Sequence, residues 1–433
     1  MLDQKFPVRL GWLITFGLCL IPLLIWASII SLPNRFSNFS SSLTSLGQVC
    51  ALVGLVLFAL ALIFSSRLTI WEKLFGGMNR VYIAHHIIGG TAFLFLLAHP
   101  VFIASAFLPT SAKLALAQVL PSTNWPVNFG ISAILLLMSL LIFTYYTPLA
   151  YQTWRLTHKF MGLVFFLAII HALYVPSDVL LNPRLKAYIL ILATVALSLH
   201  LYRTVLGRYL VKRYQYTVTA VRQLNTQVVE INLRPLKQPL IHLPGQFLFI
   251  SFLSPGFTET HPFSISSPSG KPTLTITPKA SGDYTSRLPA LPKNTPAIIE
   301  GPFGYFTYYR YENPKQTWIA GGIGITPFYS MAKSLKPGYY IDLYYTLTNQ
   351  SEAVYVNELQ HIAKEYPNFK LHYWFSQTQG HITAIAIQKA NPEILNSDIF
   401  LCGPSAMMTA LKKQFKQLGI KSYHIHSEEF KID

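Results

Sequence analysis

Six long apolar stretches in the first half of the chain constrain its fold more than any other feature. A helix that crosses a bilayer needs about 20 predominantly apolar residues. Stretches of about that length cover 11–31, 46–64, 82–108, 128–146, 155–175 and 186–206. Charges are rare, with 12 Lys or Arg and 3 Asp or Glu in residues 1–206. The sequence therefore predicts a six-helix, all-α transmembrane domain over 1–206, whose first helix is retained because no small-residue cleavage site follows it.

The basic residues predict how these helices are oriented. Six spans place both termini on one side, and the connections on that side are richer in Lys and Arg than the opposite ones. Basic residues on the terminal side are Lys5, Arg9, Arg67, Lys73, Arg80, Arg155, Lys159, Arg203, Arg208, Lys212 and Arg213, against Arg35, Lys113, Arg184 and Lys186 on the other. Because short cytoplasmic loops retain Lys and Arg, we expect cytoplasmic termini and a location in a bacterial inner (cytoplasmic) membrane.

Histidines lie at two matched depths in the third and fifth spans. Span three has His85 or His86 near its inner end and His99 near its outer end, and span five has His158 and His171. Ionisable side chains are costly in hydrocarbon and usually functional there, and neutral imidazole is an axial ligand for haem iron. Facing imidazoles on two parallel helices therefore predict two haems, about 20 Å apart along the helices. The alternative is that these are interfacial or hydrogen-bonded histidines.

Helical geometry separates the two adjacent histidines but leaves one difficulty. At 100° per residue, His85 returns to within about 40° of the face of His99, whereas His86 misses that face by about 140°. His85 is therefore the expected ligand. The 13-residue step in span five also misses by about 140°, so that span needs a π-bulge or a local helix rotation. His200 in span six has no partner at its depth, and we expect an ordinary packing or interfacial role for it.

The second half of the chain changes to alternating strands and turns. Segments such as YQYTVTAV and QVVEINLRP predict a small antiparallel β-barrel over 207–312. Within it lie HPFSISSPS at 261–269, KASGDYTSRL at 279–288 and EGPFGYF at 300–306. Hydroxyl-bearing and glycine-bearing loops of this kind can offer backbone donors to a pyrophosphate and a hydroxyl to a flavin ring.

Residues 313–433 are typical of an α/β domain with a parallel sheet. TWIAGGIGITPFYSMAKSL contains an apolar strand, a turn with Gly321, Gly322 and Gly324, and a helix that begins around Pro327. Such a turn lets a phosphate approach the backbone and the amino end of the helix. Further strand and helix units follow, and Cys402 lies at the carboxyl end of a later strand, where such sheets bind ligands. Judged alone, Cys402 could equally be a plain buried residue.

Together these features resemble the NADPH oxidase and ferric reductase superfamily over nearly the whole chain. The resemblance rests on the histidine spacings of 14 and 13 and on HPFSISS, GDYTSRL, GPFG, GGIGITPF, LCGP and the aromatic residue in SEEF, in that order. It implies a ferric-reductase-like transmembrane domain with two b haems, joined to a ferredoxin-reductase-type FAD and NAD(P)H module. The implied haem ligands are His85, His99, His158 and His171.

The resemblance also implies roles for individual residues. FAD would be contacted by His261, Pro262, Phe263 and Ser264, with Ser264 near the reactive flavin nitrogen, and its pyrophosphate by Gly282, Tyr284, Thr285 and Ser286. NAD(P)H would be bound by Gly321, Gly322, Gly324, Thr326 and Pro327 at its phosphates and by Cys402, Gly403 and Pro404 at its nicotinamide. Phe430 would cover the flavin ring until the nicotinamide displaces it, although residues 431–433 extend beyond it. The implied catalytic residues are Ser264, Cys402 and Phe430.

The expected function is electron transfer from NAD(P)H through FAD and two haems to an acceptor across the membrane. Oxygen, giving superoxide, is the expected acceptor, and a ferric chelate is the alternative. An alternative of another class is a flavin sensor tethered to a proton-conducting or partner-docking membrane domain. The segment TNQSEAVY after the strand ending YYTL has no Lys or Arg for a 2′-phosphate and no clearly placed acidic residue for a free ribose hydroxyl, so NADPH or NADH could serve.

Other partners are not indicated by the sequence. Residues 207–433 hold 22 basic and 14 acidic residues, an excess that suits an anionic nucleotide or lipid surface. No compact Lys/Arg run with interleaved aromatic residues predicts nucleic-acid binding. Three scattered cysteines predict neither a disulfide framework nor a zinc site, and no motif points to an obligate protein partner or to regulation by calcium.

Overall fold

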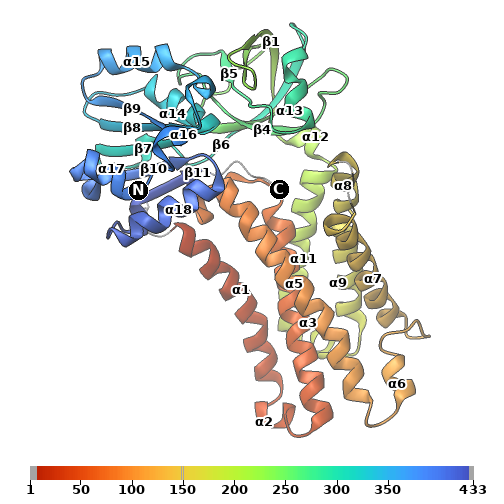
Figure 1. The fold of residues 1–433 in the computed structure, drawn as a ribbon. Helices are drawn as coiled ribbons and strands as arrows, with labels where there is room; N and C mark the ends of the chain where they lie inside the picture. Colours follow the sequence, from red (N-terminus) through yellow and green to blue (C-terminus); the bar gives the residue numbers. More distant parts are fainter. Residues whose placement is uncertain (1–6, 148, 150, 429–433) are drawn as a thin grey trace. The chain divides into compact units, whose positions relative to one another are not determined.

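The computed structural model describes residues 7–147, 149 and 151–428, and Figure 1 shows the path of the chain. These residues form two compact units, one ending at Val211 and the other beginning at Lys212. The first unit is helical, and the second contains a curled antiparallel sheet followed by a parallel sheet with helices. The predicted fold class is therefore confirmed.

The helical unit contains the expected spans. Among the described residues, six helical segments are long and apolar enough to cross a membrane. They are α1 (Pro7–Ile29), α3 (Phe39–Phe64), α5 (Met78–Phe107), α7 (Trp125–Tyr145), α8 (Tyr151–His158) continued by α9 (Met161–Tyr174), and α11 (Pro183–Thr204). Shorter helices are α2 (Leu32–Arg35), α4 (Thr69–Phe75), α6 (Ala112–Leu116), α10 (Asp178–Leu181) and α12 (Gly207–Leu210). The protein is a multi-pass membrane protein.

Helix α3 lies inside the bundle. Its residues from Gly54 to Phe64 are all buried, and it packs on α5, α11 and α1. Residues 54–64 are apolar on every face of the helix, and a helical segment of this kind is stabilised when neighbouring helices cover all of its faces. Backbone carbonyls of α3 are thereby held in place beside the neighbouring helix α5.

A buried ion pair joins two short helices of this unit. Arg35 of α2 lies 2.9 Å from a carboxylate oxygen of Asp178 in α10, and their side chains are 4% and 14% exposed. The same guanidinium donates to the carbonyl of Trp26 and to the side chain of Gln48, at 2.7 and 3.1 Å. The sequence placed Arg35 in an ordinary loop, because nothing local indicates that its charge is buried.

The fifth span is broken, which resolves the difficulty with its histidines. Helix α8 ends at His158, and α9 begins only at Met161, after a turn at Lys159 and Phe160. This break turns the two halves relative to each other and removes the 140° mismatch expected of a continuous ideal helix. The structure therefore has a turn where the sequence required a bulge or a rotation.

The second unit begins with an antiparallel barrel. Its strands are β1 (Tyr214–Gln223), β2 (Val229–Pro235), β3 (Phe247–Phe252), β4 (His261–Ser264), β5 (Leu274–Ile276) and β6 (Pro296–Phe303), in the order β4-β3-β6-β1-β2-β5. A bridge between Ile265 and Ile276 joins the two outer strands. Alternate residues of β2, namely Val229, Ile231 and Leu233, are buried in the barrel core, as the period of two requires. Helix α13 (Asp283–Arg287) follows β5.

A five-stranded parallel sheet follows. Its strands are β7 (Lys315–Gly321), β8 (Tyr340–Leu347), β9 (Phe369–Phe375), β10 (Asp398–Cys402) and β11 (Ile425–Glu428), in the order β11-β10-β7-β8-β9. Helices α14 (Ile325–Ala332) and α15 (Val356–Glu365) contribute to the core on one face, and α17 (Ala384–Ala390) and α18 (Ser405–Gln417) to the core on the other. Trp318 belongs to the first core and its neighbour Ile319 to the second, because successive residues of a strand point to opposite faces.

Candidate functional site

The segments expected to bind FAD meet beside the barrel. Strand β4 carries HPFS, and α13 carries most of GDYTSRL. The imidazole of His261 stacks on the ring of Tyr284, with ring centroids 3.9 Å apart and 25° between the planes. His261 also lies beside Glu259, with Nε2 and Oε2 3.1 Å apart. Two segments 23 positions apart in the sequence, at residues 261 and 284, therefore share one surface.

The loop before α13 is shaped by one hydroxyl. Thr285 Oγ1 accepts hydrogen bonds from the backbone N–H groups of Ser281 and Gly282, at 2.9 and 3.1 Å. Ser286 N–H donates to the Gly282 carbonyl at 3.0 Å. Ser264 at the end of β4 is buried, with 7% of its surface exposed.

The glycine-rich turn packs directly on the LCGP segment. A Cβ atom at Gly324 would overlap the carbonyl oxygen of Cys402, and one at Gly321 would lie 2.7 Å from Cδ of Pro404. One at Gly403 would lie 2.8 Å from the Cα atom of Gly321. Gly322 has φ +53°, and a Cβ there would meet no atom within 4 Å. Glycines at 321, 324 and 403 thus allow close packing, whereas Gly322 faces open space.

Cys402 is completely buried at the carboxyl end of β10. It pairs with Ala320 of β7 on one side and Glu428 of β11 on the other. Burial raises the pKa of its thiol well above the usual range, and the Glu428 carboxylate adds to that shift. The thiol therefore stays neutral and is not a thiolate nucleophile near neutral pH.

A cavity of about 170 Å³ opens between the barrel and the parallel sheet. The barrel contributes residues 225–228 and Lys279, from the β1–β2 connection and the chain after β5. The sheet domain contributes Gly322, Ile323, Tyr345, Asn349, Ser351, Glu352 and Val354. The cavity thus places Gly322 beside the end of β8, with Lys279 as a cation and Glu352 as an acid. Sequence reasoning did not single out Lys279 or Glu352. The sequence does not indicate that Lys279, which comes from the barrel, lies beside the end of β8.

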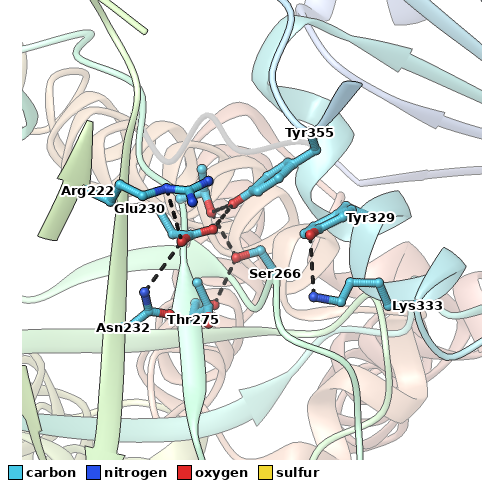
Figure 2. A network of polar contacts seen from close by, with 9 residues as sticks. Arg222, Glu230, Asn232, Ser266, Thr275, Tyr329, Lys333 and Tyr355 are labelled. Atoms are coloured by element: carbon cyan, nitrogen blue, oxygen red, sulfur yellow. Dashed lines mark hydrogen bonds and ion pairs between the residues drawn. The ribbon is translucent and has the colours of Figure 1, made fainter. Parts of the chain in front are cut away.

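Tyr355 follows the cavity residue Val354 and joins the two domains through polar contacts (Figure 2). Its hydroxyl donates to a carboxylate oxygen of Glu230 in β2 at 2.9 Å and lies 2.6 Å from the Thr277 hydroxyl. Burial raises the pKa of Tyr355, so the hydroxyl stays protonated. Its ring stacks on Tyr329 of α14, with centroids 3.8 Å apart. Tyr355 has φ +61°, a left-handed conformation that is uncommon for tyrosine.

Other hydrogen bonds cross the same boundary. The Asn225 side-chain amide donates to the Glu352 carbonyl at 3.2 Å, so two cavity residues from different domains are linked directly. Ser330 Oγ of α14 donates to the carbonyl of Ser267 at 2.6 Å. The cavity therefore depends on how the two domains are docked. Nothing in the local sequence pattern marks Tyr355, Glu230 or Asn225 for this role.

In the helical unit, the histidines of the two spans face each other in pairs. Ring centroids are 6.2 Å apart for His85 and His158, and 6.1 Å apart for His99 and His171. If a metal–nitrogen bond is about 2 Å and each nitrogen lies about 1.1 Å from its ring centre, two imidazoles on one metal have centroids about 6.2 Å apart. Both pairs therefore fit a metal held between two imidazoles.

Backbone carbonyls orient three of these four rings. Nδ1 lies 2.9 Å from the carbonyl oxygen of Ala61 for His85, of Gly47 for His99, and of Pro126 for His171. A carbonyl can only accept, so each Nδ1 carries the proton and each Nε2 keeps a lone pair free for a metal. Ala61 and Gly47 are 14 residues apart on α3 (61 − 47), as His85 and His99 are on α5 (99 − 85).

Glycines leave room around these rings. A Cβ at Gly130 would lie 2.7 Å from Nδ1 of His171, so a side chain there would displace that imidazole. A Cβ at Gly89 or Gly90, one turn beyond His85, would meet no atom within 4 Å. His86 is exposed on the adjacent face of α5, and His85 is the residue that faces His158. The donor set and the open space fit a flat, bis-imidazole metal cofactor.

The expected site residues thus form three groups. His261 and Tyr284 meet beside the barrel, the glycines of 321–324 meet Cys402–Pro404 at the sheet, and the histidines form two pairs. Thr326 is buried, and its hydroxyl donates to the Ile323 carbonyl at 3.0 Å, so it shapes the turn. Phe430 lies outside the described residues.

Three family models match the chain in succession. The ferric reductase like transmembrane component matches residues 50–169, the FAD-binding domain matches 213–306, and the oxidoreductase NAD-binding domain matches 318–413. The three matches follow the order of the bundle, the barrel and the parallel sheet. The domain types are therefore those expected from the sequence.

Relatives of known activity resemble part of the chain. The toluate 1,2-dioxygenase electron transfer component of Pseudomonas putida is 28% identical over 50% of this chain and 67% of its own length. The glycine betaine monooxygenase reductase subunit of Chromohalobacter salexigens is 26% identical over 45% of this chain and 58% of its own. Dual oxidase 1 of Sus scrofa is 27% identical over 48% of this chain but 13% of its own length. The chain thus spans about three fifths of the first two relatives.

Solved structures resemble about half of the chain. The FAD/NAD-binding domain of nitric oxide dioxygenase from Vibrio cholerae O1 biovar El Tor has 22% identity and a TM-score of 0.44, and the match covers 50% of this chain and 97% of that one.

The bundle, the barrel and the sheet, with their matching families, give the domain organisation of a membrane-bound flavoprotein oxidoreductase: a ferric-reductase-like transmembrane component followed by an FAD-binding and an NAD-binding domain. More particularly, the chain has the architecture of the NADPH oxidase and ferric reductase superfamily.

Proposed function

We propose that this protein carries electrons from cytosolic NADPH or NADH through FAD and two b haems to oxygen on the outer side of a bacterial inner membrane, producing superoxide. The haem proposal rests on two facing pairs of histidines. Ring centroids are 6.2 Å apart in the first pair and 6.1 Å apart in the second. Three of the four rings keep Nε2 free by donating from Nδ1 to a backbone carbonyl. The bias of Lys and Arg between the connections supports the orientation.

The nucleotide would lie in the cavity between the barrel and the sheet. A Cβ at Gly322 would meet no atom within 4 Å, so a nucleotide phosphate could approach the backbone there. Lys279, which also lines the cavity, would attract the negative charge of that phosphate. Glu352 is held by a hydrogen bond from the Thr348 backbone N–H at 3.0 Å and could accept from a ribose hydroxyl. Cys402, Gly403 and Pro404 would line the nicotinamide position. This combination of cation and acid suits either NADPH or NADH.

FAD would bind where β4 meets α13. His261, Pro262, Phe263 and Ser264 would contact its ring system, and the N–H groups around Gly282 would face its pyrophosphate. Phe430 would cover the ring until nicotinamide takes its place. FAD bound there would supply the conversion from two-electron to one-electron chemistry that couples NAD(P)H to one-electron carriers.

His85 and His158 would hold the inner haem, and His99 and His171 the outer one. A haem with two imidazole ligands carries one electron and has no open coordination position. Oxygen would therefore be reduced without binding iron. A ferric chelate reduced at the same outer edge is the alternative acceptor, and the likeness to Dual oxidase 1 favours oxygen.

Two measurements test this proposal in order. A dithionite-reduced minus oxidised spectrum with a pyridine haemochrome assay should give about two b haems per chain, and protein without haem would refute it. Cytochrome c reduction by NAD(P)H should then be blocked by superoxide dismutase. Ferric-chelate reduction that dismutase does not affect would assign the protein to the alternative activity.

A further inference from the structure

His158 is held differently from the other three paired histidines. Its Nδ1 is buried and has no hydrogen-bond partner among the residues that the structure describes. Trp154, one turn earlier, stacks on its ring with centroids 5.4 Å apart and 29° between the planes. Within the described part of the chain no backbone carbonyl orients this imidazole, so its direction depends on the backbone that carries it.

That backbone ends a helix. His158 is the last residue of α8, and the turn at Lys159 and Phe160 follows immediately. In a continuous α-helix the Lys159 carbonyl would accept from the N–H of Leu163. Here the N–H of Leu163 donates to Phe160 at 2.9 Å, and only the N–H of Gly162 reaches the Lys159 carbonyl, at 3.4 Å. The break therefore leaves this carbonyl poorly satisfied by its own helix.

His200 of α11 supplies the missing donor. Its Nε2 lies 3.0 Å from the Lys159 carbonyl oxygen and must donate, because a carbonyl only accepts. His200 is 8% exposed. Gly162 makes the approach possible, since a Cβ there would overlap the His200 ring. An unmade hydrogen bond at a buried helix break is costly in a bilayer, so this contact stabilises the turn.

We propose that His200 is a positioning residue for the inner-haem ligand His158. By holding the Lys159 carbonyl, it fixes the turn between α8 and α9 and so aims His158 at His85. This inference rests on the proposed haem function. It replaces the packing or interfacial role expected for His200 from the sequence with a defined one.

The test uses the full-length protein in detergent and compares His200→Leu, His200→Gln and His86→Leu. Leu fills the site without a donor, whereas the carboxamide of Gln can place an N–H near the position of Nε2. His86→Leu is the matched control, because His86 is exposed in the neighbouring part of the bundle. Haem per chain and the low-spin electron paramagnetic resonance signals are measured, with flavin reduction by NADH as the check on folding.

His200→Leu should lose about half of the haem, or shift only one of the two low-spin signals, while His200→Gln and His86→Leu keep both. Gly162→Ala, which would displace the same ring, should behave like His200→Leu. Wild-type haem content and signals in His200→Leu would overturn the inference, as would equal loss in the Leu and Gln variants. If the wild-type protein itself binds no haem, the proposed function fails first and the inference with it.

Discussion

Replacing Tyr355 with phenylalanine removes one hydroxyl from the contact between the barrel and the sheet domain. That hydroxyl donates to Glu230 at 2.9 Å and lies 2.6 Å from the Thr277 hydroxyl. The ring, which stacks on Tyr329, is retained. The change therefore weakens the docking of the two domains without creating a cavity.

The expected cost follows from these contacts. A hydrogen bond to a charged group contributes about 1.5–3 kcal/mol, and one to a neutral group about 0.5–1.5 kcal/mol. The Thr277 hydroxyl keeps Ser266 as a partner at 2.8 Å, so most of the loss falls on the Glu230 carboxylate. We expect a loss of about 2 kcal/mol, which corresponds to at most about a 30-fold change in an equilibrium constant.

Nucleotide affinity reports this loss, because the cavity has one wall from each domain. We expect Tyr355→Phe to weaken NADP⁺ binding by about 5-fold to 30-fold, measured by titration of the flavin absorbance in the full-length protein. Tyr373→Phe is the control, since the Tyr373 hydroxyl is buried without a partner among the described residues. Affinity within twofold of wild type in Tyr355→Phe would refute the idea that this contact shapes the cavity.

Three further changes test other parts of the molecule. Asp178→Asn should destabilise the helical unit by about 3–5 kcal/mol, because it leaves the Arg35 charge buried and unpaired. In thermal unfolding, the double variant Arg35→Met with Asp178→Leu should lose less stability than Asp178→Asn does. A double-variant loss equal to the sum of the two single-variant losses would contradict this prediction. The raised pKa of Cys402 predicts little iodoacetamide labelling at pH 9 in peptide mapping, whereas the urea-unfolded chain is labelled; equal labelling would contradict its burial. Gly324→Ala should slow flavin reduction by NADH at least about tenfold without loss of flavin, and a wild-type rate would show that the Cys402 strand can move aside.

Local patterns in the sequence were enough for the architecture. The six apolar stretches, the alternating strands after 212 and the glycine-rich turn at 321–324 each carry their own periodicity or turn chemistry, and each is present in the structure. The histidine spacing of 14 on α5 also singled out His85, which faces His158. These features are readable because they depend on residues close together in the chain.

Contacts between distant segments were decided only by the tertiary structure. The break after His158, the donor from His200 that supports it and the burial of Arg35 against Asp178 all involve residues far apart in sequence. The same is true of Tyr355 with Glu230 and of Lys279 in the cavity. A helical or strand period tells which face of an element is apolar, but it does not tell which neighbour's polar atom will meet that face. The sequence alone therefore determined the domains and their order, while packing determined which side chains hold the sites in place.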